Sequence, residues 1–230
     1  MNKVKKAILS FISICFVLTA TAQKWQPGVF TDIKGNTETG FIRPNPSGKG
    51  PVKDEGFIEF KKDEKMNPIK LSAGELRSFM VGKDSFVVAH APKNESWGSK
   101  ELDFVKVVLN EEVKLYLGRG SSGGGGFRPG LSGGIGGGSG GYGGGVGGGV
   151  GISFGGNGGG GKGKATYYFG ANTSELVQLT PNNFIDIMSD IMGDEPEVVD
   201  RIHENKFNIN NIEKLIAYFK AVKAEHAAQQ

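Results

Sequence analysis

Val113-Lys114-Leu115-Tyr116-Leu117 and Ala165-Thr166-Tyr167-Tyr168-Phe169 are two short stretches rich in β-branched and aromatic residues. This composition predicts a β-strand in each of them. Between the two, residues 118–163 contain 28 glycines in 46 positions. We interpret the two stretches as the arms of one β-hairpin with an expanded turn, because closing so long a loop adds only about 2 kcal/mol. The residues on both sides of the glycine-rich block are therefore predicted to form one domain.

The glycine-rich block, residues 119–163, is predicted to be a flexible insert, because few of its side chains can pack and offset the entropy lost on ordering. An ordered or self-assembling strip is the alternative. Two series of apolar residues recur in the block at intervals of four, so an extended chain would place the members of each series on one side. They form a candidate contact strip for an envelope protein or for self-association: Phe127, Leu131, Ile135, Tyr142, Val146, Val150 and Phe154.

Short strand patterns also recur about every ten residues in the rest of the first half of the chain. The predicted strands are 28–33, 38–43, 57–60, 68–71, 77–81, 86–91 and 102–109, and one more follows the block at 176–179. The stretch 102–109 is apolar on both faces except for Asp103 and Lys106, as is typical of a central strand. Regular short strands separated by turns predict an antiparallel sheet or a small barrel.

After Thr180 the spacing of apolar residues changes to that of helices. Three helices are predicted over 181–230, with Thr180, Asp194 and Asn210 as the residues that cap them. Phe219 belongs to an apolar stripe on the third helix, which favours packing on the protein's own core over binding a groove or a membrane. The predicted fold class is α+β: an antiparallel sheet or small barrel of roughly eight to ten short strands, interrupted by the glycine-rich insert and followed by about three C-terminal helices.

The first 22 residues have the three parts of an export signal. A basic start is followed by an apolar run over 7–18 and by the small residues Ala20-Thr21-Ala22. This order predicts cleavage between Ala22 and Gln23. The predicted organisation is a signal peptide (1–22), a β domain (23–118 plus 164–180), the glycine-rich insert (119–163) and a helical region packed on the β domain (181–230). The exported product is expected in the periplasm, on the outer envelope surface or outside the cell.

The charge distribution argues against a nucleic-acid partner. The chain has 27 basic and 24 acidic residues, and three of the basic ones, Lys3, Lys5 and Lys6, lie in the leader. The remaining chain carries 24 of each sign and thus lacks the basic surplus that nucleic-acid binding needs. Beyond the leader, no stretch reaches the roughly 20 apolar residues of a membrane span. Cys15 is the single cysteine and lies in the leader, which excludes disulfides and cysteine-ligated metals from the exported product.

Matches to catalytic motifs fall inside the glycine-rich block, where any pattern of glycines recurs by composition. Residues 151–155 match a nucleophile elbow and 156–162 match the front of a phosphate loop, but neither lies between a strand and a helix. The three histidines, His90, His203 and His226, lack the spacing of a zinc site. No cofactor, metal or catalytic residue is therefore predicted. We favour a non-catalytic binding or structural protein, with a hydrolase that uses dispersed carboxylates as the alternative.

Three glycine-containing segments near the start, Gly28-Val29-Phe30-Thr31, Gly35-Asn36-Thr37 and Gly40-Phe41-Ile42, carry a resemblance. They are similar to the opening hairpin of many exported β-rich proteins of Gram-negative bacteria whose activity is not known. In those proteins a Gly-x-Ile-Thr, Gly-Asp-Thr and Gly-x-Ile series follows a signal that ends in Ala-Gln. Asn36 stands where they have aspartate, and the glycine-rich block is not part of their pattern. The resemblance implies a β-rich envelope or secreted protein and assigns no ligand or site residue.

Overall fold

The computed structural model describes residues 25–92, 97, 100–118 and 166–229. The strands are β1 (Gln26–Asp32), β2 (Thr37–Arg43), β3 (Phe57–Lys61), β4 (Ile69–Ser72), β5 (Leu76–Val81), β6 (Asp84–His90), β7 (Leu102–Asn110), β8 (Lys114–Gly118), β9 (Thr166–Gly170) and β10 (Val177–Gln178). The helices are α2 (Phe184–Ile191), α3 (Pro196–His203) and α4 (Ile212–Ala228), with short 3-10 turns η1 (Ala73–Glu75) and η2 (Ile209–Asn211).

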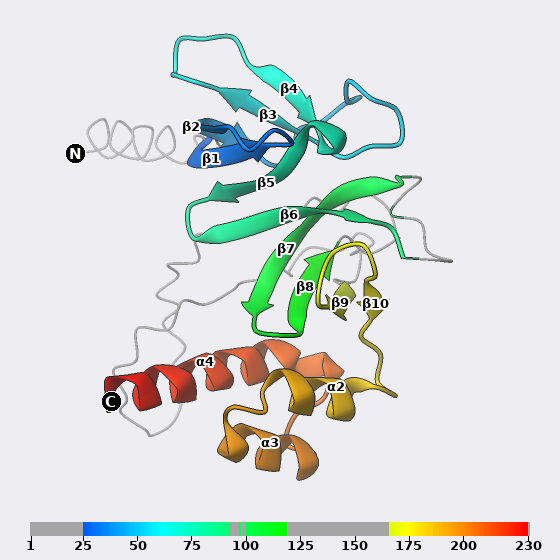
Figure 1. Ribbon diagram of the computed structural model, residues 1–230, viewed down its shortest axis with the longest axis vertical. Helices are drawn as coiled ribbons and strands as arrows, with labels where there is room; N and C mark the ends of the chain where they lie inside the picture. Colours follow the sequence, from blue (N-terminus) through cyan, green and yellow to red (C-terminus); the bar gives the residue numbers. More distant parts are fainter. Residues whose placement is uncertain (1–24, 93–96, 98–99, 119–165, 230) are drawn as a thin grey trace, which may run out of the picture.

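All ten strands belong to one antiparallel sheet with the spatial order β10-β9-β8-β7-β6-β5-β1-β2-β3-β4. The sheet is open, so of the two predicted forms the sheet is confirmed and the small barrel is not. Strands β1–β4 lie at one end of the molecule and the three helices at the other (Figure 1). The predicted α+β class is therefore confirmed.

The opening hairpin of β1 and β2 places Gly28 directly opposite Gly40. Both glycines make room for neighbouring side chains, since a Cβ atom at Gly40 would lie 2.6 Å from the ring of Phe60 and one at Gly28 would lie 2.9 Å from Ile42. Gly35 has a φ of +92° in the turn between the strands, a conformation that other residues rarely adopt. Close packing therefore favours glycine at Gly28 and Gly40, and the positive φ favours it at Gly35.

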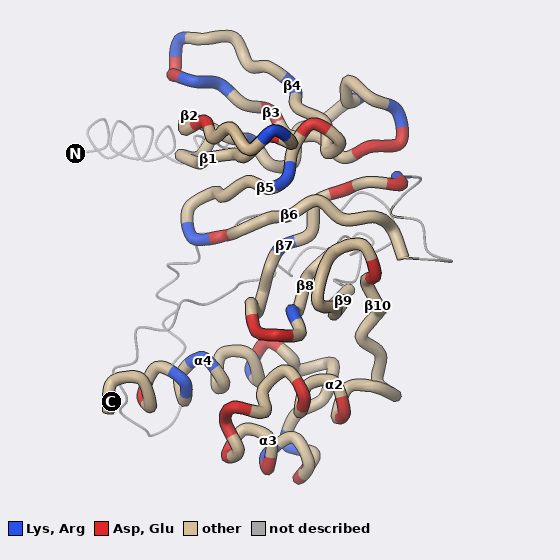
Figure 2. The backbone as a smooth tube through the Cα atoms, in the orientation of Figure 1, with Lys and Arg blue, Asp and Glu red and all other residues tan. Residues whose placement is uncertain are grey.

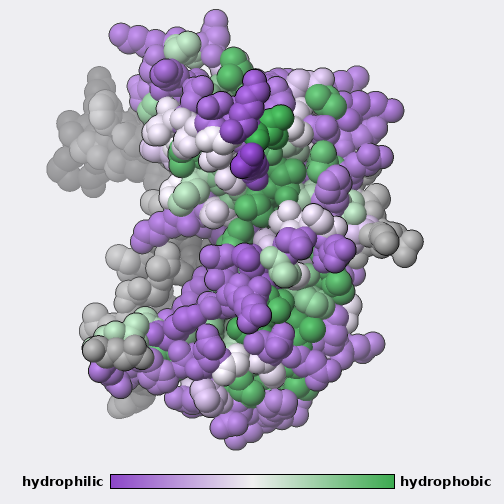
Figure 3. All heavy atoms as spheres, in the orientation of Figure 1, coloured by the Kyte–Doolittle hydropathy of each residue, from purple (hydrophilic) through white to green (hydrophobic). Residues whose placement is uncertain are grey.

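Strand β5 follows β4 through η1, yet it pairs with β1 rather than with β4. Strands β1–β6 enclose a hydrophobic core that includes an edge-to-face pair of Phe30 and Phe60. Its buried members are Phe30, Ile42, Ile58, Phe60, Leu76, Phe79, Val81 and Phe86. In the view of Figure 3, hydrophobic residues are visible along the middle of the molecule between more hydrophilic ends.

The two strands that flank the glycine-rich block pair with each other as predicted. The register of β8 and β9 runs from Lys114 opposite Gly170 to Gly118 opposite Thr166. On one face of these strands, Tyr116 and Tyr168 pack in a second core with Trp97, whose indole N–H donates a hydrogen bond to the Tyr168 hydroxyl at 3.0 Å. Both strands of the hairpin and the ladder between them thus lie within the described residues.

The helices cover the opposite face of β7–β9 with a third core. Sheet residues such as Leu115, Leu117 and Tyr167 pack there with Met188 of α2 and Phe219 of α4. Phe219 is only 1% exposed, which confirms the predicted packing of the α4 stripe on the protein itself. In the part of the chain that the structure describes, no helix combines the length and the apolar content required to cross a membrane.

The predicted capping residues were wrong at all three helices. The residue before α2 is Asn183, whose side-chain oxygen accepts hydrogen bonds from the N–H and the hydroxyl of Thr180. Before α4, Asn208 caps the turn η2, which leads directly into the helix. Asn183, Glu195 and Asn211 make no side-chain capping hydrogen bond, so no local capping signal marks where each helix begins. The residues directly before α2, α3 and α4 are Asn183, Glu195 and Asn211, in place of Thr180, Asp194 and Asn210.

Candidate functional site

The side of strands β1, β2, β3 and β5 that points away from the Phe30 core forms the candidate site, which we call the Trp25 face. Directly paired residues of neighbouring strands share a face, so the register defines its membership. Met80 is 43% exposed and Pro27 is exposed, while Val29 and Phe41 are half-buried. The members of the face are Trp25, Pro27, Val29, Phe41, Arg43, Lys61 and Met80.

Two cations lie against the ring of Trp25, which is the first described residue of the chain. The Arg43 guanidinium carbon is 5.1 Å from the ring centroid, and the Lys61 ammonium nitrogen is 4.8 Å from it. The Lys61 ammonium is also 5.9 Å from the centroid of Phe41. These are distances at which a cation is attracted by the negative face of an aromatic ring. Two cationic side chains of this face therefore contact the same aromatic ring.

The two cations differ in how their charge is balanced. Arg43 forms an ion pair with Glu59, a buried carboxylate on β3. Lys61 donates a hydrogen bond to the backbone oxygen of Glu64 at 3.2 Å and makes no ion pair among the described residues. Lys70, which is opposite Glu59 in the register, lies 5.2 Å from the ring of Phe57. Three of these four charged side chains, Arg43, Lys61 and Lys70, are basic, and Glu59 is acidic. The charge of Lys61 is therefore available to a ligand.

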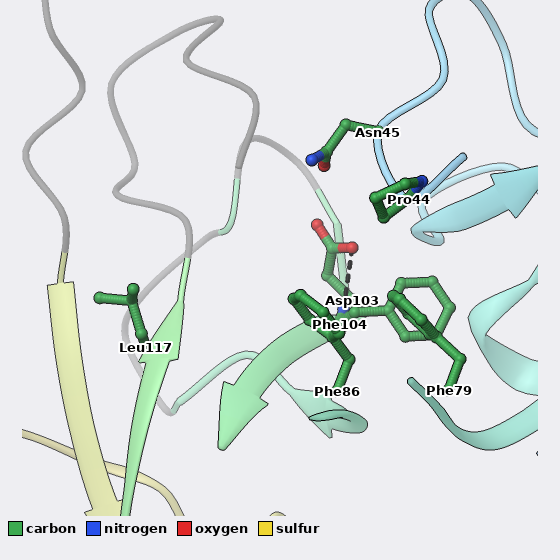
Figure 4. A pocket seen from close by; sticks show the side chains of 7 residues that line it. All are labelled: Pro44, Asn45, Phe79, Phe86, Asp103, Phe104 and Leu117. Carbon is green, nitrogen blue, oxygen red and sulfur yellow. Dashed lines mark hydrogen bonds between the residues drawn. The ribbon is translucent and has the colours of Figure 1, made fainter. Parts of the chain in front are cut away.

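A shallow hollow at the start of β7 was the second candidate, because it contains a buried carboxylate (Figure 4). The Asp103 carboxylate accepts a hydrogen bond from the Phe104 N–H at 2.9 Å and lies 3.1 Å from the Lys100 ammonium. The hollow has room for about one water molecule. Its lining residues are Pro44, Asn45, Phe79, Phe86, Asp103, Phe104 and Leu117. Asp103 is the single carboxylate in this lining, whereas hydrolysis by paired carboxylates requires two.

Two contacts that resemble parts of catalytic sites occur on the helices. His226 lies 2.6 Å from a carboxylate oxygen of Glu195, and the Ser189 hydroxyl lies 3.4 Å from a ring nitrogen of His203. His90 is exposed at the end of β6. Neither pair forms a hydrogen bond to a third group of a catalytic triad among the described residues. Within the described ranges, no group of three or more histidine, aspartate or glutamate side chains is placed to hold a metal ion.

Several shifted pKa values occur where the helices pack. Burial, with a contribution from the charge of Glu213, raises the pKa of Tyr167 well above its usual range. Burial also raises the pKa of Glu213 itself. The pKa of Lys220 is lowered by burial and by the nearby charge of Lys106. Since burial is the leading cause in each case, these shifts follow from helix packing and do not indicate an acid–base site.

Charge is distributed unevenly over the molecule, with acidic residues gathered on α2 and α3 (Figure 2). Glu197 of α3 accepts a hydrogen bond from the Tyr218 hydroxyl, which lowers the pKa of Glu197, and Arg201 lies over the Tyr218 ring. These three side chains thus interact with one another at the junction of α3 and α4. They therefore serve helix packing rather than a site.

The site residues predicted from sequence fall outside the described residues. This applies to the cleavage position at Ala22 and Gln23, and to the contact strip Phe127, Leu131, Ile135, Tyr142, Val146, Val150 and Phe154. The Trp25 face was missed by the sequence analysis. The alternation of Pro27, Val29 and Phe41 could have indicated a partly apolar outer face, but Lys61 joins it only through the register of β2 and β3.

Comparison of the chain with protein-family models, with curated proteins and with solved structures gives no match. The function is therefore argued from the residues of this chain alone.

Proposed function

We propose that the protein is an exported, non-catalytic binding protein of the cell envelope or of the secreted fraction. The observation that carries this proposal is the Trp25 face, where aromatic and apolar side chains and two cations lie on the outer side of a sheet. The export-signal pattern of residues 1–22 supports its location.

The rigidity of the sheet favours binding by this face. Phe41 and Lys61 are paired directly across β2 and β3, and Val29 and Met80 are paired across β1 and β5. Their backbones are held by the ladder and by the core beneath, so little conformational entropy is lost when a partner binds. Trp25 and Arg43 belong to residue types that often contribute most of the binding energy at interfaces.

The glycine-rich insert is proposed as a second, separate contact region. Its candidate strip would bind an envelope protein or a second copy of the chain, because glycine allows close approach of backbones and the aromatic residues supply buried area. The role of the Trp25 face does not depend on this second region.

The proposal is tested by capture of partners from an envelope extract with four forms of the protein. These are the wild type, Lys61→Glu, Lys62→Glu and a chain that lacks residues 119–163. Lys62 is exposed next to Lys61 but makes no contact with the Trp25 ring, so its variant is the matched control. We expect capture that is lost in Lys61→Glu and kept in Lys62→Glu. Equal capture by all forms would show that neither region binds.

A further inference from the structure

The Trp25 face has a regular layout that restricts the shape of its ligand. One row across the strands contains Met80 and Val29, and the next contains Pro27, Phe41 and Lys61. A third row contains Arg43, Glu59 and Lys70, with Trp25 adjacent to Arg43. The row of Met80 and Val29 is therefore apolar, and the next row, two residues further along the strands, contains the basic Lys61. A ligand that contacts both the apolar side chains and the cations of this face must be flat and apolar on one side and must carry negative charge.

We propose that the Trp25 face binds an acidic polysaccharide, that is, a chain of sugar rings that carry carboxylate groups. This inference rests on the proposed function and names the partner of the same face. A sugar ring has a flat side of C–H bonds that can lie on Phe41, Pro27 and Val29, while its carboxylate reaches the Lys61 ammonium.

Charge complementarity is the main argument for an acidic ligand. Lys61 and Arg43 are held close to one ring, and the single acidic side chain among them, Glu59, is 6% exposed and already paired with Arg43. A carboxylate that approaches Lys61 gains a charge-assisted hydrogen bond.

The half-buried apolar side chains of the face favour a polysaccharide over an acidic membrane. Membrane-binding surfaces bury apolar side chains several ångströms into the lipid, and they usually combine these with clusters of basic residues. Val29 and Phe41 are half-buried within the sheet surface, and only Lys61 and Arg43 are basic next to them. The same layout offers an acidic peptide no free sheet edge, because β2 and β1 are both paired on each side.

The experiment is a binding titration of the full exported protein with oligogalacturonate, a chain of sugar rings with one carboxylate each. The comparison probes are a neutral glucan of the same length, polyglutamate, and vesicles that contain phosphatidylglycerol. Wild type is compared with Lys61→Glu, Trp25→Ser and the control Lys62→Glu, and thermal melting checks that each variant is folded. If Trp25→Ser does not fold, the comparison of Lys61→Glu with Lys62→Glu decides alone.

We expect oligogalacturonate to bind the wild type and affinity to fall as salt rises. Lys61→Glu should weaken binding by about tenfold or more, as expected for loss of one charge-assisted hydrogen bond, and Lys62→Glu by much less. Absence of oligogalacturonate binding, equal binding of the neutral glucan, or equal weakening by both lysine variants would overturn the inference, as would tighter binding of polyglutamate or vesicles. If the protein does not bind oligogalacturonate but capture from extract still depends on Lys61, only the proposed ligand class is wrong. If both fail, the proposed function is wrong as well.

Discussion

Gly118 and Thr166 are directly opposite each other in the β8–β9 ladder, although 47 residues of sequence separate them. A Cβ atom at Gly118 would lie 2.7 Å from the ring of Tyr168, so the end of β8 is packed closely against its partner strand. The Tyr168 hydroxyl in turn accepts the hydrogen bond from Trp97. The hairpin is therefore held by its own ladder and by packing right up to the residues from which the insert departs.

Removal of the insert should leave the fold intact. If residues 119–163 are replaced by a short Asn-Gly turn, we expect the stability to unfolding by urea to rise by at most about 2 kcal/mol, because less loop entropy is lost on folding. Circular dichroism and urea unfolding of the shortened chain measure both properties. A shortened chain that fails to fold would contradict the view of the block as an insertion in a hairpin.

Replacement of the aromatic residues of the strip separates a contact role of the insert from a spacer role. If the strip is a contact surface, Phe127→Ser, Tyr142→Ser and Phe154→Ser together should abolish association while the melting temperature stays constant. Sedimentation velocity and thermal melting of the triple variant measure these two properties. Unchanged association would mean that the block acts only as a spacer.

Substitution of Phe219 should show that α4 is part of the fold. Phe219→Asp buries a charge in the core between α4 and the sheet and should lower the free energy of unfolding by about 3 kcal/mol or more. Ala217→Asp, at an exposed position of the same helix, is the control and should change it by less than about 0.5 kcal/mol. Thermal melting of both variants measures the difference. Similar melting of the two would indicate that the apolar stripe is exposed in solution.

Gly56 should be intolerant of any side chain. A Cβ atom at this position would lie 1.9 Å from a carboxylate oxygen of Asp103, and the Gly56 N–H donates to the Leu102 oxygen at 2.7 Å. We expect Gly56→Ala to cost about 1–3 kcal/mol in urea unfolding, as overpacking of a core does. Gly193→Ala is the control, since its nearest backbone oxygens are 3.4 and 3.5 Å from the new Cβ atom. Equal stability of the two variants would mean that the loop before β3 moves away from Asp103.

Tyr167 should contribute to loss of stability at alkaline pH. Its pKa in the folded protein is raised above the unfolded value of about 10, so its contribution is complete below that pH and is lost as the pH rises above it. The free energy of unfolding, measured in urea at about pH 8 and about pH 11, should therefore change less between the two pH values in Tyr167→Phe than in wild type. An identical difference in both proteins would mean that Tyr167 ionises at its ordinary pKa in the folded state.

Export should remove the leader between Ala22 and Gln23, two residues before Trp25. Mass spectrometry of the exported protein measures the new N-terminus. A protein that starts at another residue, or that carries an acyl group on Cys15, would show that the leader is processed differently.

Most secondary structure was predictable because its signals are local. The strand at 102–109 could be recognised by its apolar residues on both faces, and the pairing of the two arms around the glycine-rich block followed from their composition and adjacency in the sheet. The candidate site was not predictable in the same way. Lys61 and Trp25 are 36 positions apart, and nothing near either of them in the sequence indicates that they share a ring contact.

The elements of this protein follow from local patterns in its sequence: ten strands, three helices, and the apolar stripe that places Phe219 in the core. These depend on the alternation of side chains along a strand and around a helix, which neighbouring residues set. Three other features depend on contacts between distant segments: β5 pairs with β1, Asp103 is buried against Gly56, and Arg43 and Lys61 both contact Trp25. The physical reason is that the choice of strand partner and register is made by packing between segments far apart in the chain, and such packing leaves no local pattern to read.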